Sequence, residues 1–265
     1  MERIKKNKPM LVYDQLGREI IIAEKPKRII SLVPSITDFL AYLGLENEIV
    51  GITKFCVHPE FIYRSKTRVG GTKQVHYDLI DKLEPDLIIA NKEENSLDIV
   101  SRLEEKYKVY VSDINDTDQA LTMMLAISKI VKKEKEGELL VNKIRANFKH
   151  IKEKNLSPRS SAYLVWNDPL MACGADTYIN SVMKLLGYEN VFNNMNRYPV
   201  MSVEELQRKS PEVLLLPSEP FPFKEKHKVY YQQLFPNSEI KLVNGEIFSW
   251  YGSYMLNILS YIKSS

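Results

Sequence analysis

The chain has 265 residues, 44% of them hydrophobic, and its 37 Lys and Arg residues nearly balance 34 Asp and Glu residues. A chain of this length and apolar content is long enough for two globular domains with real cores. Because the charge is nearly balanced, the composition argues against nucleic-acid binding. The densest basic run, which starts at Lys129, interleaves lysines with glutamates and is typical of a solvated helix face.

The beginning of the chain, MERIKKNKPMLVYDQLG, has a basic segment but lacks the apolar stretch of about 7–15 residues that a signal peptide needs. We therefore expect a cytoplasmic protein if Met1 is the native start, and an exported one if an export segment is missing. No run of about 18 apolar residues occurs, so no membrane-spanning helix is predicted. The spacing of Cys56 and Cys173 resembles neither a zinc site nor a redox pair, and a disulfide between them stays open.

Strand and helix signals alternate in the first part of the chain, after a short extended lead-in. Ser35 is the expected N-cap of the first helix and Gly44 its stop. The alternation predicts an α/β fold with short parallel strands. The expected strands are 28–32, 48–52, 86–90 and 108–112, and the expected helices are 34–44, 77–84 and 96–107.

Residues 118–154 carry no strand signal and no proline, which predicts helix, broken once near Lys132. The second piece, from Lys133 to Lys154, would be about 33 Å long at 1.5 Å per residue. The segment NLSPRSS ends it. Beyond it we expect strands at 161–166, 212–218 and 240–244, and helices at 177–187, 203–209 and 254–262. The sequence thus predicts an N-terminal α/β lobe over 1–117, a helical linker over 118–156 and a C-terminal α/β lobe over 157–265.

A weak internal repeat supports two similar lobes. DLIDKLEPDLIIA and EELQRKSPEVLLL both follow the pattern helix, proline, acid, strand. Asp78 precedes Pro85 by the same interval as Glu204 precedes Pro211, so the two carboxylates are predicted to occupy related positions. Chance similarity of two such units is the alternative.

Five segments, in order, carry a resemblance to a known family. KRIISLVPSITDFLAYLGLENEIVGITKFCVHP, VGGTKQVHYDLIDKLEPDLIIA, YENVF, YPVMSVEEL and FSWYGS resemble the substrate-binding proteins of ABC importers for vitamin B12, haem and iron siderophores, and are closest to the cobalamin-binding branch. The resemblance covers about Lys27 to Ile262. It implies two α/β lobes joined by a single long backbone helix, with the ligand in a cleft between the lobes.

The resemblance also nominates residues on loops at strand ends, most of them aromatic. Rigid aromatic walls suit a flat apolar macrocycle, because they supply contact area at little entropic cost. The ligand-binding candidates are Phe55, Cys56, His58, Trp166, Asn167, Met171, Tyr198, Trp250 and Tyr251. The chain departs from the B12 binder at Thr72, where that protein has tryptophan, and at Ser249 and Trp250, which replace a charged pair. These differences leave the identity of the chelate open.

In the same family one acidic residue on each lobe docks onto arginines of the permease dimer. Asp78 and Glu204 stand at the matching positions, which are also the positions that the repeat relates. Exposed ion pairs contribute only about 0–1 kcal/mol each, so such a pair would mainly provide orientation and a faster encounter.

The stretch FCVH admits three interpretations. A protein metal site needs three or four ligands, and Cys56 with His58 supplies two at most, although either is a candidate axial ligand to a chelated cobalt or iron. A nucleophile needs a base in reach, which this spacing does not provide. We favour the lip of a pocket, where Phe55 stacks on the ligand while Cys56 and His58 shape the rim.

No GxGxxG, Walker, HExxH or GxSxG motif occurs, so we expect a binding protein and not an enzyme. No cofactor is expected beyond the transported cobalt or iron chelate. The expected partners are that chelate and an ABC permease dimer, and the protein itself is expected to be a monomer. The alternative is a cytoplasmic protein or enzyme that handles corrinoids or metal chelates and reuses the fold.

Overall fold

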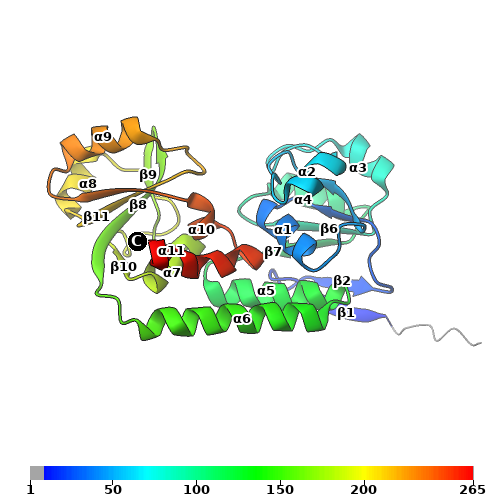
Figure 1. Ribbon diagram of the computed structural model, residues 1–265. Helices are drawn as coiled ribbons and strands as arrows, with labels where there is room; N and C mark the ends of the chain where they lie inside the picture. The colour runs from blue at the N-terminus through cyan, green and yellow to red at the C-terminus, as the bar shows by residue number, and fades with distance from the viewer. Residues whose placement is uncertain (1–8, 265) are drawn as a thin grey trace, which may run out of the picture. The chain divides into compact units, whose positions relative to one another are not determined.

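The computed structural model describes residues 9–264, whose helices and strands are labelled in Figure 1. The strands are β1 (Met10–Tyr13), β2 (Glu19–Ile22), β3 (Ile29–Ser31), β4 (Ile49–Ile52), β5 (Thr67–Arg68), β6 (Leu87–Asn91), β7 (Val109–Ser112), β8 (Arg159–Asn167), β9 (Leu170–Ala172), β10 (Tyr188–Asn190), β11 (Val213–Pro217) and β12 (Glu239–Val243). The helices are α1 (Pro34–Tyr42), α2 (Glu60–Ser65), α3 (Tyr77–Leu83), α4 (Leu97–Glu104), α5 (Thr117–Ile130), α6 (Glu134–Glu153), α7 (Tyr178–Leu185), α8 (Val203–Lys209), α9 (Glu225–Leu234), α10 (Gly245–Ser249), the 3-10 helix η1 (Gly252–Asn257) and α11 (Ile258–Ser264).

The chain packs into two compact units. Unit 1 comprises the described residues up to Asp113, with Gln119–Asn142 and Tyr251–Ser253. Unit 2 comprises Ile114–Asp118, Lys143–Trp250 and the described residues from Tyr254. The 20-residue helix α6 supplies residues to both units. The predicted boundaries of two lobes and a separate helical linker stay a prediction, because these units follow the packing of the chain and divide α5 and α6.

Unit 1 is built on a parallel sheet with strand order β5-β4-β3-β6-β7. All five residues of the interior strand β6 are buried, as expected for a strand covered on both faces. On one face, Ile80 of α3 and Leu103 of α4 lie in one cluster with Ile30 and Ile88. Because all the strands are parallel, their carboxyl ends meet at one edge, where open α/β sheets present ligand-binding loops.

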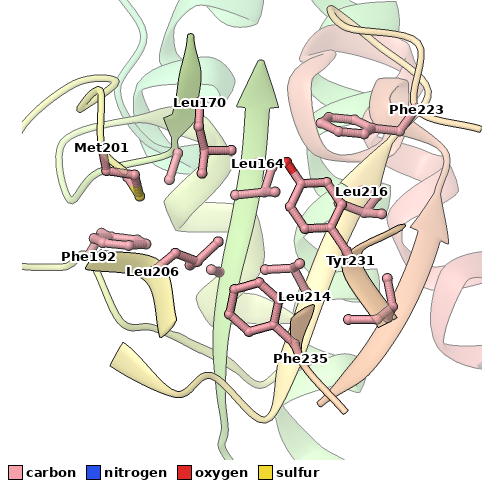
Figure 2. Close-up of a cluster of buried hydrophobic side chains, with 13 residues drawn as sticks. Leu164, Leu170, Phe192, Met201, Leu206, Leu214, Leu216, Phe223, Tyr231 and Phe235 are labelled. Carbon is pink, nitrogen blue, oxygen red and sulfur yellow. The ribbon is translucent and has the colours of Figure 1, made fainter. Parts of the chain in front are cut away.

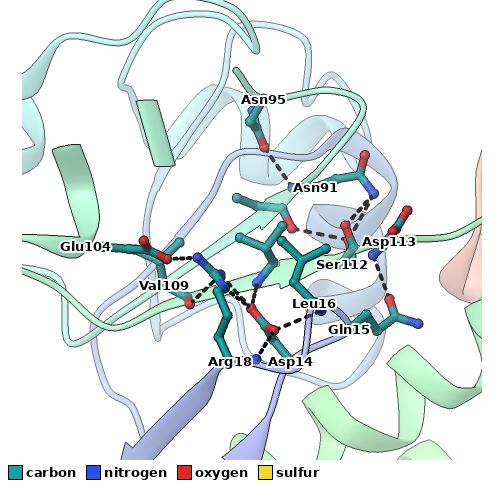
Figure 3. A network of polar contacts seen from close by, with 12 residues as sticks. Asp14, Gln15, Leu16, Arg18, Asn91, Asn95, Glu104, Val109, Ser112 and Asp113 are labelled. Carbon is teal, nitrogen blue, oxygen red and sulfur yellow. Dashed lines mark hydrogen bonds and ion pairs between the residues drawn. The ribbon is translucent and has the colours of Figure 1, made fainter. Parts of the chain in front are cut away.

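The hairpin of β1 and β2 is a separate two-stranded sheet that polar contacts join to β7 (Figure 3). The Arg18 guanidinium donates to the Asp14 carboxylate, with Nε 2.8 Å from Oδ2, and also contacts Glu104. Oδ2 of Asp14 accepts the Val111 amide at 3.2 Å, and the Gln15 amide donates to the Val111 carbonyl at 3.2 Å. The buried Asp14 carboxylate is thus satisfied by charged and backbone donors, which fixes the turn end of the hairpin.

Unit 2 has a parallel sheet of order β10-β8-β11-β12, with β9 antiparallel to β8. Figure 2 shows its core, in which Leu206 of α8, Tyr231 of α9 and Phe235, which caps the end of α9, pack on Leu214 and Leu216 of β11. The two helices therefore cover the same face of the sheet. Within the described residues, no helix combines the length and the apolar character needed to cross a bilayer.

The predicted repeat is confirmed between the two units. Helices α3 and α8 each have seven residues, and each is followed by a left-handed residue, Glu84 with φ 42° or Ser210 with φ 45°. A buried proline and a fully buried five-residue strand, β6 or β11, come next. The polar caps differ, since Ser202 forms a capping box with Glu205 on α8 whereas His76 gives α3 no side-chain cap.

Two predicted helix boundaries have clear outcomes. The break near Lys132 is confirmed, because α5 ends at Ile130, Lys132 has φ 57° and α6 begins at Glu134. Ser35 as the N-cap of the first helix is wrong. The cap is Val33, since Pro34, which lacks an N–H and has a suitable fixed φ, occupies the first helical position.

Candidate functional site

The predicted site residues lie on both units, most of them on loops at strand ends. Phe55, Cys56 and His58 follow β4 of unit 1, and Tyr251 also belongs to unit 1. Trp166 and Asn167 end β8 of unit 2, Met171 lies in β9, and Tyr198 and Trp250 lie in loops. Each unit therefore carries its own set, and each set is described separately.

Phe55 presents an accessible aromatic ring in unit 1, with half of its surface exposed. The ring lies beside Gly71 on the next loop, where a Cβ atom would come within 3.2 Å of Phe55 Cε2. The Lys54 ammonium lies 5.1 Å from the ring centroid. Thr72, the position at which the chain departs from the B12 binder, is held on this loop because its carbonyl accepts the Asn95 side-chain amide at 3.0 Å.

Cys56 lies beneath this loop and has no exposed surface. Its Sγ atom is 3.1 Å from Thr37 Oγ1 and 3.2 Å from Thr53 Oγ1, and burial raises the pKa of the thiol. The interpretation of Cys56 as a rim residue is wrong, because the side chain points into the interior. A buried, protonated thiol is also a poor nucleophile and a poor metal ligand.

His58 is exposed on the same loop, and its role as an axial ligand stays a prediction. Within the described residues, no group of three or more His, Cys, Asp and Glu side chains is placed to hold a metal ion. Both cysteines are free and buried, so no disulfide joins them.

Trp166 presents an accessible aromatic ring in unit 2 and is 39% exposed. Its indole N–H donates to the Asp168 carbonyl at 3.0 Å, which fixes the ring. Phe221 meets Trp166 edge-on at 5.5 Å and meets His227 at 5.3 Å. The sequence analysis missed Phe221, which only the aromatic-rich segment FPF after β11 signalled.

His227 has a defined protonation state in this aromatic group. Its Nδ1 accepts the backbone N–H of Lys224 at 2.9 Å, so the neutral ring carries its proton on Nε2. Burial and the neighbouring Lys226 and Lys224 lower the pKa of His227. The ring is therefore neutral at pH 7 and offers an N–H donor.

The remaining unit 2 candidates differ in accessibility. Asn167 Oδ1 accepts a hydrogen bond from the Tyr231 hydroxyl at 3.0 Å. This bond fixes the orientation of the side-chain amide, whose NH₂ group can then donate to another acceptor. Met171 and Tyr198 are half-buried. The loop of Tyr198 is held by Arg197, whose guanidinium donates to Asn115 Oδ1 at 2.9 Å.

Trp250 and Tyr251 are buried, at 6% exposure each. Trp250 Nε1 donates to Glu219 Oε1 at 2.8 Å, and the Ser249 hydroxyl donates to the same oxygen at 2.9 Å. The two aromatic rings thus expose little surface in this structure, and their contact with a ligand stays a prediction. Sequence analysis missed Glu219, which accepts hydrogen bonds from both Ser249 and Trp250.

Asp78 and Glu204 are exposed at the second position of α3 and of α8. The pKa of Glu204 is lowered mainly by its own backbone N–H and by the Ser202 hydroxyl, as expected in the first turn of a helix. Glu204 is therefore fully ionised at neutral pH.

A cavity of about 450 Å³ in unit 2 contains none of these candidates. Its walls come from the start of α5, the end of α6, α7 and the loop before β8, and two lysines, Lys152 and Lys184, line it. These elements do not present the carboxyl ends of the sheet strands. We therefore place the candidate ligand surface at the strand ends and not at this cavity.

Comparison with known proteins identifies the family of the chain. A family described as periplasmic binding protein matches residues 29–241. The chain is 25% identical to an ABC transporter substrate-binding lipoprotein, YvrC, of Bacillus subtilis, over 78% of this chain and 68% of the relative. It is also 25% identical to the vitamin B12-binding protein of Vibrio vulnificus, over 72% of this chain and 71% of the relative.

Solved structures show the same fold. The periplasmic vitamin B12 binding protein BtuF of Vibrio cholerae superposes with a TM-score of 0.78 at 20% identity, covering 91% of this chain and 96% of that one. A periplasmic haem binding protein of Pseudomonas aeruginosa gives a TM-score of 0.77 at 16% identity, covering 90% and 92%. The predicted α/β fold and the predicted family are confirmed.

Proposed function

Because the chain belongs to the periplasmic binding protein family, we propose that it binds a metal chelate and delivers it to an ABC permease. The chelate is a cobalamin-like corrinoid, haem or a ferric siderophore. The observation that carries the proposal is the pair of accessible rings, Phe55 and Trp166, at the carboxyl ends of strands in the two units. The protein acts as a carrier and not as an enzyme.

The two rings suit the faces of a planar or compact chelate. Each is fixed by its surroundings, Phe55 by the Gly71 loop and Trp166 by its indole hydrogen bond and Phe221. Rings that are already ordered lose little entropy on binding, and their apolar area supplies the affinity. The Asn167 amide and the His227 Nε2–H add donors beside Trp166 for the polar substituents that such chelates carry.

Asp78 and Glu204 are the proposed contacts with the permease. Their equivalent positions on α3 and α8 match two arginine-bearing subunits related by symmetry. Exposed acids gain little net energy from pairing, so their contribution is to orientation and encounter. The lipoprotein and periplasmic relatives support a place of action outside the cytoplasm.

The alternative is a cytoplasmic chelate-handling protein or an enzyme that reuses the fold. The residue on which the sequence would base such an enzyme, Cys56, is buried and has a raised thiol pKa. No observation therefore favours catalysis at this cysteine. Alkylation that abolished a turnover activity at Cys56 would reverse this conclusion.

The test is a titration of the purified protein with cyanocobalamin, haemin and a ferric hydroxamate, followed by Trp fluorescence and by calorimetry. The chain has two tryptophans, and only Trp166 is substantially exposed. We expect one chelate class to quench Trp166 with a saturable, stoichiometric binding curve, and Trp166→Phe to remove the quenching while calorimetric binding persists. Absence of binding with all three classes would reject the proposal.

A further inference from the structure

Four buried polar side chains lie beneath the loop that carries Phe55 in unit 1. Ser31 ends β3, Thr37 lies in α1, and Thr53 and Cys56 follow β4. None of these four side chains has exposed surface. Because β3 and β4 are neighbouring parallel strands, the four groups gather at the carboxyl edge of the sheet, where the candidate ligand surface of this unit lies.

The contacts between these groups are continuous and form a hydroxyl–thiol network. Thr53 Oγ1 lies 3.2 Å from Cys56 Sγ, and Sγ lies 3.1 Å from Thr37 Oγ1. Thr37 Oγ1 lies 2.9 Å from Ser31 Oγ, and the Ser31 hydroxyl donates to the Val33 carbonyl at 3.1 Å. A hydroxyl or thiol donates one hydrogen and also accepts, so every member of the network has a partner.

Thr53 connects this network to the backbone of the aromatic residue. The Phe55 N–H donates to Thr53 Oγ1 at 3.4 Å, and the Cys56 N–H donates to the Thr53 carbonyl at 3.1 Å. The turn from Thr53 to Cys56 is thus closed by hydrogen bonds at both ends, with the two end side chains joined in the interior. Phe55 lies between these two anchored residues, and its ring is half exposed.

We propose that Thr37, Thr53 and Cys56 are positioning residues, which hold the turn of residues 53–56 so that the Phe55 ring is already ordered for the chelate. This inference rests on the proposed function, in which Phe55 contacts the chelate. Apolar side chains would fill the same space without needing partners, whereas a buried polar network is satisfied only when its members keep hydrogen-bonding distances. A ring that is already held in place loses less entropy on binding, so the network raises affinity without touching the chelate.

The first test observes Phe55 in the full chain without a chelate, by fluorine NMR with 4-fluorophenylalanine in place of Phe55. Thr53→Val keeps the shape of the side chain and removes the oxygen that links Cys56 to the Phe55 N–H. We expect its fluorine signal to broaden or divide and to move toward the signal of the unfolded protein. Thr53→Ser restores the oxygen and should retain the wild-type signal. Cys56→Ala and Cys56→Ser form a second pair with the same expectation.

The second test measures affinity by calorimetric titration with cyanocobalamin, haemin and a ferric hydroxamate. For each of these that the wild-type protein binds, Thr53→Val should weaken binding by about tenfold, because the ring must then be ordered on binding. Thr53→Ser should bind as the wild type does. Ser128→Ala is the matched control, because it removes another fully buried hydroxyl of unit 1, on α5, and should change neither affinity nor the fluorine signal.

Thermal unfolding shows whether each variant folds. An unchanged fluorine signal with unchanged affinity in folded Thr53→Val would overturn the proposal and assign the network to stability alone. Equal losses in Thr53→Val and Thr53→Ser, or in Thr53→Val and Ser128→Ala, would overturn it as well. If none of the three chelates binds the wild-type protein, the proposed function fails, while the fluorine spectra still decide whether the network orders Phe55.

Discussion

Asp78 and Glu204 occupy the same position in two equivalent helix and strand pairs, one in each unit. Each is the second residue of a seven-residue helix that ends in a left-handed residue and leads through a proline into a buried strand. Both side chains are exposed. Under the proposed function, each of these acids contacts one subunit of the permease dimer.

Replacing Asp78 and Glu204 with Lys should stop chelate transport and leave chelate affinity unchanged, because the acids lie on exposed helix starts and not beside the accessible rings. Uptake by cells or permease vesicles and calorimetric titration measure the two properties. A lysine in the first turn also opposes the helix dipole, at about 0.3–1 kcal/mol for each position.

The control variant replaces acids with lysine in the first turns of two other helices, so that it carries the same helix-dipole cost. Asp98 and Glu225 lie in the first turns of α4 and α9, outside the repeat positions. Asp98→Lys with Glu225→Lys should show similar destabilisation with normal transport. Loss of chelate affinity in the Asp78 and Glu204 variant, with stability retained, would contradict the docking assignment.

The sequence predicted the elements with strong local signals and missed those without them. Strands β6 and β11 are apolar runs, and each follows a helix, α3 or α8, from which a proline separates it. The sequence therefore predicted the positions of these two helix and strand pairs. Helix α9 has a single buried residue, Tyr231, and no apolar period to reveal it. The hairpin that pairs β9 with β8 is short, and its partner strand follows a proline.

The candidate site was predicted less completely than the fold. Phe55 and Trp166 are accessible as expected, but Cys56 and Trp250 are buried although their neighbours in sequence are polar or exposed. Loop residues have no periodicity that separates an inward from an outward side chain. Phe221 reaches Trp166, and His227 reaches Phe221, only through the crossover from β11 to α9, a tertiary relationship that spacing does not encode.

Phe55→Ala should weaken chelate binding by about tenfold, since removing a stacked ring loses roughly 1–3 kcal/mol of contact. Gly71→Ala should have a smaller effect of the same sign, because its Cβ would press on Phe55 Cε2 from 3.2 Å. Calorimetric titration measures both. Phe61→Ala is the control, because Phe61 is 57% exposed on α2, away from this loop. Equal losses for Phe55→Ala and Phe61→Ala would remove Phe55 from the site.

Gly137→Ala should destabilise the protein, opposite to the usual effect of this substitution in a helix. Alanine normally gains about 1 kcal/mol over glycine there. A Cβ at Gly137 of α6 would overlap Ser128 Oγ of α5 and lie 2.5 Å from Ser128 Cβ, so the two helices would have to separate. We expect a net loss of about 1–3 kcal/mol in urea unfolding. Asn142→Ala, exposed on the same helix, should instead gain a few tenths of a kcal/mol.

Alkaline pH should unfold the protein partly through its two buried thiols. Burial raises the pKa of the Cys56 thiol above its ordinary value of 9.0, and it raises the pKa of Cys173 from the same value to about 12. The unfolded state therefore releases these protons first. The stability that the thiols contribute is complete below pH 9 and is lost as the pH rises from there through the folded pKa values.

Comparison with a variant that lacks both thiols isolates this contribution, because tyrosines, whose ordinary pKa is 10.0, also begin to ionise in the unfolded chain between pH 9 and 10. Each thiol adds up to about 1.4 kcal/mol per pH unit to the slope of the unfolding free energy. Urea unfolding at a series of pH values measures that slope. Cys56→Ala with Cys173→Ala lowers stability at every pH but should flatten the slope. An unchanged slope in this variant would show that the thiols ionise in the folded state as easily as in the unfolded one, contrary to their burial.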